Sequence, residues 1–155
     1  PRLALAVAQM ADTVIGDIGW TRRRDLRELA IQALNLHLRC DFSFHAHLPI
    51  AEGAGITLEQ QAAVPYWRTS PLFDDEQRLV IEYTMACAAG PVDEPLFERV
   101  KTRFGEAGAV EFTVTIGWWV LWAILLNATS PVFRAERAQP LPKDSSELGE
   151  PPADH

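Results

Sequence analysis

The chain has 155 residues and a net charge of −7, and 48% of its residues are hydrophobic. This length and composition are typical of one soluble folded domain with its own core, and they exclude a natively disordered chain. The acidic balance also argues against a nucleic-acid partner, because a polyanion is repelled by a negatively charged surface.

The cysteine content bears on compartment and on metal binding. Cys40 and Cys87 stand far apart in the sequence, which does not suggest a disulfide framework or a zinc site. His37 has no matching carboxylate or histidine nearby, so we expect no metal site. The presence of only two cysteines favours a reducing compartment, and we therefore expect a cytoplasmic protein.

The N-terminal part of the chain predicts two helices. Residues 1–10 are apolar but lack the basic region and the cleavage site of a signal peptide. We interpret them as a helix or as the start of a truncated chain. The next helix is predicted over 21–38, where apolar residues recur at helical spacing after Thr21, a candidate N-cap.

Two shorter helices are predicted next. One begins near Asp41 and ends at the glycines of 53–55, and Pro49 is expected to kink it or to fix its later turns. Thr57 with Gln60 three residues later forms the capping box of the other. A loop with two prolines follows over 64–71.

The second half of the chain predicts three more helices. Acidic residues at 74–76 favour a helix N-terminus, and that helix is expected to stop at the Gly-Pro pair of 90–91. A further helix is predicted over 95–104, and glycines separate it from an apolar last helix. No stretch shows the alternation of a strand with hairpin turns, so the predicted fold class is all-α.

The apolar last helix must be compared with a membrane span. Residues 112–133 carry no charge and include three tryptophans. A spanning helix needs about 20 predominantly apolar residues. The apolar part, 116–126, is only 11 residues long, and Thr113, Thr115, Gly117 and Asn127 interrupt or end it. We therefore predict a buried core helix and no membrane partner.

The composition changes near residue 134. The last residues are rich in proline and acidic side chains and almost lack large apolar ones. Such a segment buries too little surface to offset its ordering entropy. The predicted organisation is a helical domain over 1–133 followed by an acidic, proline-rich tail over 134–155.

Four residues form a candidate catalytic group, namely Glu28, Cys40, Ser43 and His47. Cys40 precedes a predicted helix, and Ser43 and His47 follow at i+3 and i+7, so the three project from one face. Amides at a helix N-terminus favour a thiolate, and a nearby imidazole exchanges protons with a bound molecule. Glu28, on a neighbouring helix, can orient that imidazole or take the proton itself.

Each of these residues also has a structural interpretation. By spacing alone, Cys40 is typical of a buried small hydrophobic residue and His47 of a structural histidine. Glu28 is typical of a solvated charge paired with Arg24 one turn earlier. His45 points elsewhere, and we interpret it as structural.

The spacing Glu28-x11-Cys40-x2-Ser43-x3-His47 resembles the active-site motif of the carboxymuconolactone decarboxylase and alkylhydroperoxidase D superfamily. In the peroxidase branch that motif reads Glu-x11-Cys-x2-Cys-x3-His. The segments RELAIQALNLHLRCDFSFHAHLPIAEGAGIT, SPLFDDEQRLVIEYT and IGWWVLWAILLNA are also similar to successive parts of the family. The resemblance covers roughly residues 20 to 130.

The resemblance implies a six-helix-type domain that assembles as a homotrimer or homohexamer, with the site near a subunit interface. In the peroxidase branch it implies a cysteine pair served by a glutamate and a histidine that relay protons. In the decarboxylase branch it implies acid/base residues acting on a small carboxylated lactone, without a cysteine pair.

This sequence departs from the peroxidase motif at Ser43. A serine cannot form a disulfide with Cys40, so a two-thiol cycle is excluded. A one-cysteine cycle through a sulfenic acid, reduced by an outside thiol, stays chemically open. Val120 and Ile124 replace polar residues of many relatives, which indicates a more apolar pocket.

We therefore carry three functional hypotheses. The first is a cofactor-free lyase or isomerase acting on a small carboxylated lactone or an aromatic or polyketide-like acid, with His47 as general acid or base and Glu28 as its partner. The second is a thiol-dependent peroxidase acting through Cys40. The third is a non-catalytic, oligomeric binding protein. The residues expected to contact substrate are Ser43, Phe44, Trp118 and Trp119.

Overall fold

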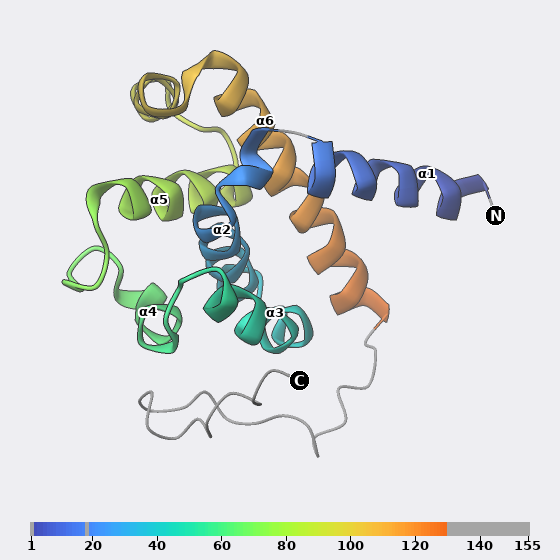
Figure 1. Ribbon diagram of the computed structural model, residues 1–155, viewed down its shortest axis with the longest axis horizontal. Helices are drawn as coiled ribbons and strands as arrows, with labels where there is room; N and C mark the ends of the chain where they lie inside the picture. Colours follow the sequence, from blue (N-terminus) through green and yellow to red (C-terminus); the bar gives the residue numbers. More distant parts are fainter. Residues whose placement is uncertain (1, 18, 130–155) are drawn as a thin grey trace.

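The computed structural model describes residues 2–17 and 19–129 (Figure 1). Six α-helices, one π-helical turn and two 3-10 turns account for most of this part of the chain, which contains no strand. The predicted all-α class is therefore confirmed. The predicted tail over 134–155 lies outside the described residues.

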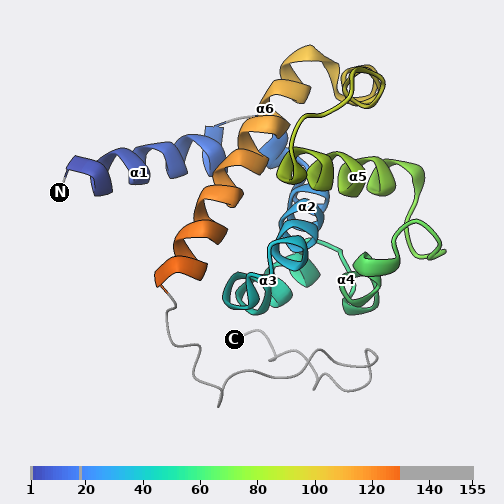
Figure 2. The same ribbon diagram turned by 180° about the vertical axis from the view of Figure 1, so that it is seen from behind.

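The N-terminal helix α1 (Arg2–Asp12) projects from the body of the molecule in both views (Figures 1 and 2). A π-helical turn (Thr13–Asp17) and a 3-10 turn (Gly19–Arg22) connect it to α2 (Arg24–His37). The expected helix start at Thr21 is therefore wrong by three residues, because the chain still follows the 3-10 turn there.

Helices α3 (Asp41–Gly53) and α4 (Leu58–Ala63) follow the predicted boundaries, and Pro49 lies inside α3. The capping box at the start of α4 is confirmed. The Thr57 hydroxyl accepts a hydrogen bond from the Gln60 amide at 3.1 Å, and the Gln60 side chain accepts one from the Thr57 amide at the same distance. Local hydrogen bonds of this kind depend on a few neighbouring residues, so the sequence alone reveals them.

Helix α5 (Asp75–Ala89) begins with a second capping box, formed by Asp74 and Gln77. The two helices predicted after it form one element, α6 (Glu94–Thr129), which bends at Gly105 (Figure 1). Gly105 has a φ of 75°, a left-handed conformation that glycine adopts without the steric penalty of a Cβ atom. The predicted break is thus present as a kink.

Helix α2 is the central element, and α3, α5 and α6 pack around it (Figures 1 and 2). Every residue from 26 to 35 is buried, whether apolar or polar. A helix buried on all sides needs partners for its polar side chains, because an unpaired polar group in the interior costs free energy; in α2 the buried side-chain atom without a partner among the described residues is Oδ1 of Asn35. The polar side chains of α2 therefore determine where the buried hydrogen-bond networks lie.

Helix α6 is long and apolar enough to cross a membrane, by length and composition only. One third of its most apolar stretch is buried inside the structure. The buried residues face α2 and the N-terminal turns, and they include Trp118 and Trp119 in one cluster with Ile31 and Leu34. The prediction of a buried core helix therefore holds for the face of α6 that carries Trp118 and Trp119. Other apolar residues of α6, such as Leu121 and Ile124, are exposed.

Candidate active site

Helices α2 and α3 bring Glu28 and His47 together, although 19 positions separate them in the sequence. The Nδ1 atom of His47 lies 2.8 Å from Oε2 of Glu28. The Glu28 side chain is only 1% exposed, whereas that of His47 is 19% exposed. The alternative of a solvated Glu28 paired with Arg24 is therefore wrong, because α2 is buried at this position.

The second carboxylate oxygen of Glu28 is held by Arg27. The Nε and Nη2 atoms of Arg27 donate to Oε1 of Glu28 at 3.2 and 3.1 Å. A buried carboxylate is costly unless it is paired and hydrogen-bonded, and here each oxygen has its own partner. No sequence pattern singles out Arg27, because adjacent helical residues do not normally face each other.

The pairing with Glu28 fixes the orientation of the His47 ring. A carboxylate oxygen accepts hydrogen bonds, so the tautomer that fits this contact carries its proton on Nδ1, and the Nδ1–H group donates a hydrogen bond to Oε2. The other ring nitrogen, Nε2, is then the atom available to a bound molecule. Trp119 packs edge-on against the imidazole, with ring centroids 6.1 Å apart and an interplanar angle of 76°.

His47 opens onto a pocket of about 310 Å³ between the end of α1 and the following turn, α3 and α6. This volume is within the range that accommodates a small molecule. Most of the lining is apolar or aromatic, and Ser43 and His47 are its polar side chains apart from the indole groups. The aromatic lining residues are Phe42, Trp118, Trp119 and Trp122.

Besides Glu28, which is connected to this pocket only through His47, two of the expected site residues do not line it. Cys40 is 0% exposed and Phe44 is buried, and neither lines the pocket. Positions 42, 43, 46 and 47 share one face of α3, and position 44 falls on another, as helical periodicity requires. Phe42 therefore takes the place at the pocket that we expected of Phe44, whereas Ser43, Trp118 and Trp119 line it as expected.

Trp118 brings a polar atom close to the pocket. Its indole nitrogen is buried and has no hydrogen-bond partner within the described part of the chain. Its ring packs edge-on against Trp122, with centroids 5.8 Å apart. Buried polar groups are usually paired, so this indole nitrogen is an exception among the residues that line the pocket.

The second cysteine, Cys87, lies on α5, and its thiol is partly buried. Burial raises the pKa of the Cys87 thiol, an effect that a hydrogen bond with Tyr83 partly offsets. A raised pKa keeps the sulfur as a thiol, which is a weaker nucleophile than a thiolate. In the described ranges, no three histidine, cysteine, aspartate or glutamate side chains gather as a metal site.

The comparisons with known proteins add one relative. No family model matches the chain. It is 32% identical over 109 residues to the uncharacterized protein YnjA of Escherichia coli strain K12, an alignment that covers 64% of this chain and 59% of that protein. The chain thus spans somewhat less than two thirds of this relative, whose description states no activity.

Proposed function

We propose that the chain is a cofactor-free enzyme of the carboxymuconolactone decarboxylase and alkylhydroperoxidase D-like kind that transfers a proton on a small carboxylated lactone or an aromatic or polyketide-like acid. The observation that carries this proposal is the 2.8 Å contact between His47 and the buried Glu28, at the wall of a pocket of about 310 Å³. His47 is the general acid or base, and Glu28 is its positioning partner.

A decarboxylation illustrates the chemistry that this arrangement supports. When the bond between the carboxylate carbon and the neighbouring carbon breaks, CO₂ leaves and the electron pair forms an enolate with an adjacent carbonyl group. Nε2 of protonated His47 donates its proton to the enolate carbon, while Glu28 keeps accepting from Nδ1. Ser43, on the same face of α3, is a candidate donor to the enolate oxygen.

The burial of Cys40 favours proton transfer over the peroxidase hypothesis. Its thiol is 0% exposed, and a hydroperoxide must reach the sulfur to oxidise it. We expect no sulfenic acid adduct at Cys40 when the native protein is treated with hydroperoxide and a trapping reagent. Rapid trapping at Cys40 together with peroxide consumption would favour the peroxidase instead.

The buried ion pairs favour an enzyme over a non-catalytic binding protein. Arg27 and Glu28 form an ion pair in the interior at a cost in desolvation, which replacement by apolar residues would avoid, and the Glu28 carboxylate also contacts His47. A buried ion pair that is connected to a pocket through a histidine, as here through His47, is typical of a functional site.

We also propose that the chain assembles with copies of itself, as a trimer or a hexamer. Large apolar side chains are exposed on the projecting α1 and on the C-terminal half of α6, and burial between subunits would remove them from water. Those with at least 45% exposure in these two elements are Leu3, Leu5, Leu121, Ile124 and Leu125. Light scattering of the purified protein measures the assembly directly, and a monomer at micromolar concentration contradicts it.

The test of the proposed activity is CO₂ release from carboxymuconolactone and from a panel of aryl β-keto acids. We expect His47→Ala to lower kcat/KM by roughly a hundredfold or more, because general acid–base catalysis contributes factors of this size. His45→Ala is the matched control, since His45 lies on the same helix and contacts the carbonyl of Asp41 at 2.8 Å. Equal activity of both variants on an accepted substrate would overturn the assignment of His47.

A further inference from the structure

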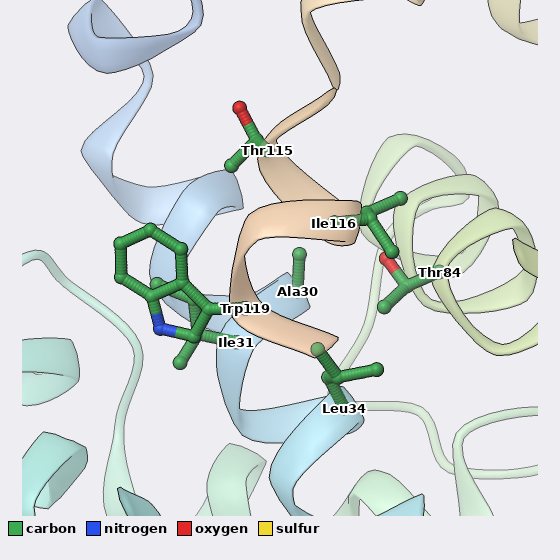
Figure 3. Close-up of a pocket in the computed structure, with 7 residues that line it drawn as sticks. All are labelled: Ala30, Ile31, Leu34, Thr84, Thr115, Ile116 and Trp119. Carbon is green, nitrogen blue, oxygen red and sulfur yellow. The ribbon is translucent and has the colours of Figure 1, made fainter. Parts of the chain in front are cut away.

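A second, much smaller cavity lies behind the candidate active site. It measures about 10 Å³ and is lined by residues of α2, α5 and α6 (Figure 3). Its walls include Ala30, Ile31 and Leu34 from α2, and Thr84 from α5. Among the residues that line either cavity, Trp119 is the one that lines both.

The inner cavity is apolar in character. The hydroxyl group of Thr84 donates to the carbonyl of Val80 at 2.7 Å, and that of Thr115 donates to the carbonyl of Glu111 at 2.8 Å. Both threonines thus satisfy their hydrogen bonds within their own helices. A volume near that of a single water molecule, with no polar group left to bind one, is typical of a dry cavity.

Trp119 separates this apolar space from the pocket that contains His47. Its side chain is largely buried and packs in one cluster with Ile31 and Leu34, while its ring edge contacts the imidazole of His47. A substrate whose reacting carbon lies at Nε2 of His47 therefore meets the indole of Trp119 before it reaches the inner cavity.

We propose that Trp119 determines substrate specificity by setting the inner limit of the pocket, so that the site accepts compact acids and rejects those with a long apolar extension. This inference rests on the proposed function, since it concerns the substrate class of the same site. Replacement of the indole by a smaller apolar side chain joins the two cavities. The enlarged pocket then accepts an alkyl or aryl extension between α2, α5 and α6.

The test is a binding series with phenylacetate, phenylbutyrate and phenylhexanoate, measured by isothermal titration calorimetry. The wild-type protein is expected to bind phenylacetate best and the longer acids progressively more weakly. In Trp119→Leu the order reverses, with a gain of about fourfold for each methylene group that enters the joined cavity, since burying one methylene contributes about 0.8 kcal/mol.

Trp122→Leu is the matched control, because Trp122 lines only the outer pocket. It is expected to weaken all three acids and to keep their order. Trp119→Phe removes less volume than Trp119→Leu and provides a second variant in case the leucine variant misfolds. Circular dichroism checks the fold of both variants. Trp119→Phe is expected to strengthen binding of the longer acids relative to phenylacetate, but by a smaller factor than Trp119→Leu. An unchanged order in both Trp119 variants, an equal reversal in Trp122→Leu, or no binding of any acid would overturn the proposal.

The same titrations in His47→Gln separate this inference from the proposed function. The variant keeps a polar side chain at the pocket but lacks the imidazole. The titrations compare His47→Gln with the double variant that also carries Trp119→Leu. If Trp119→Leu still reverses the order of the three acids, and no turnover that depends on His47 is found, the specificity role stands and the proposed reaction fails. If turnover depends on His47 but the size preference ignores Trp119, the reaction stands and the specificity role fails.

Discussion

Helix α2 takes part in two buried polar networks, which connect it to different helices and differ in whether they reach a pocket. One joins Gln32 and Asn35 to Gln61 of α4 through amide hydrogen bonds, the shortest of them 2.6 Å between Gln32 and Gln61. The other joins Arg27 and Glu28 to His47 of α3. The amide network remains inside the protein, whereas the charged network ends at a ring nitrogen beside a pocket.

The amide network connects three helices through main-chain groups. The side chain of Gln32 donates to the carbonyl of Phe44 at 3.2 Å, and that of Gln61 donates to the carbonyls of Leu48 and Ile56 at 3.3 and 3.1 Å. All its side chains are neutral and fully buried. The comparison of the two networks shows that buried polar groups alone do not identify a candidate site. The distinguishing feature is that one member of the charged network lines a cavity.

The largest expected effect comes from the charged network. Glu28→Gln keeps the size of the side chain but removes the negative charge that accepts from Nδ1 of His47. We expect kcat/KM per folded molecule to fall by roughly a hundredfold, and the free energy of unfolding in urea to fall as well, by about 3–5 kcal/mol, because the buried Arg27 loses its charge partner. A large loss of stability with unchanged activity per folded molecule would make the two networks equivalent and contradict the comparison.

The amide network is expected to affect stability without affecting activity. Gln61→Leu leaves Gln32 and two main-chain carbonyls without their partner, and each unsatisfied buried group costs about 1–3 kcal/mol. We expect the free energy of unfolding to drop by about 3 kcal/mol, with kcat/KM near the wild-type value at a temperature where the variant is folded. Thr57→Ala, which removes only the cap of the same helix α4, serves as a milder control of about 1 kcal/mol. A loss of kcat/KM comparable to that of Glu28→Gln would contradict the structural role.

A half-exposed ion pair gives the smallest effect. Asp25 accepts from Arg23 at 2.9 Å, and this hydrogen bond lowers the pKa of the Asp25 carboxyl. A lowered pKa in the folded state means that the pair stabilises the protein above the ordinary aspartate pKa, and that this contribution disappears as the pH falls through the lowered value. Because both side chains are more than a third exposed, Asp25→Asn is expected to cost only about 0.5 kcal/mol at neutral pH.

Urea unfolding as a function of pH measures this effect. The variant should lose less stability than the wild type between neutral and strongly acidic pH, and the two curves should converge at low pH. A constant offset between the curves at every pH would show that Asp25 acts by packing and not by its charge.

The sequence predicted what depends on neighbouring residues. The capping box at Thr57, the helix start after the acidic residues of 74–76 and the interruption at Gly105 follow from local hydrogen bonding, from the helix dipole and from the backbone freedom of glycine. The contact between Glu28 and His47 depends on how α2 packs against α3, which local periodicity does not specify. The family-like spacing was what singled out both residues.

The missed features have equally physical reasons. Phe42, not Phe44, lines the pocket, because which face of α3 meets α6 is decided by packing and both faces carry an aromatic residue. Arg27 escaped notice because it pairs with the next residue along the helix, outside the usual i+3 and i+4 pattern. The start of α2 was misplaced because the 3-10 turn over Gly19–Arg22 has no clear sequence signal.

A double-mutant cycle on kcat/KM for CO₂ release tests the central claim most directly, namely that Glu28 acts through His47. Glu28→Gln, His47→Ala and the double variant are compared with the wild type on the same substrate. If the two residues act as one unit, the double variant is no slower than His47→Ala alone. If the two losses multiply, Glu28 acts independently of His47 and the account is contradicted.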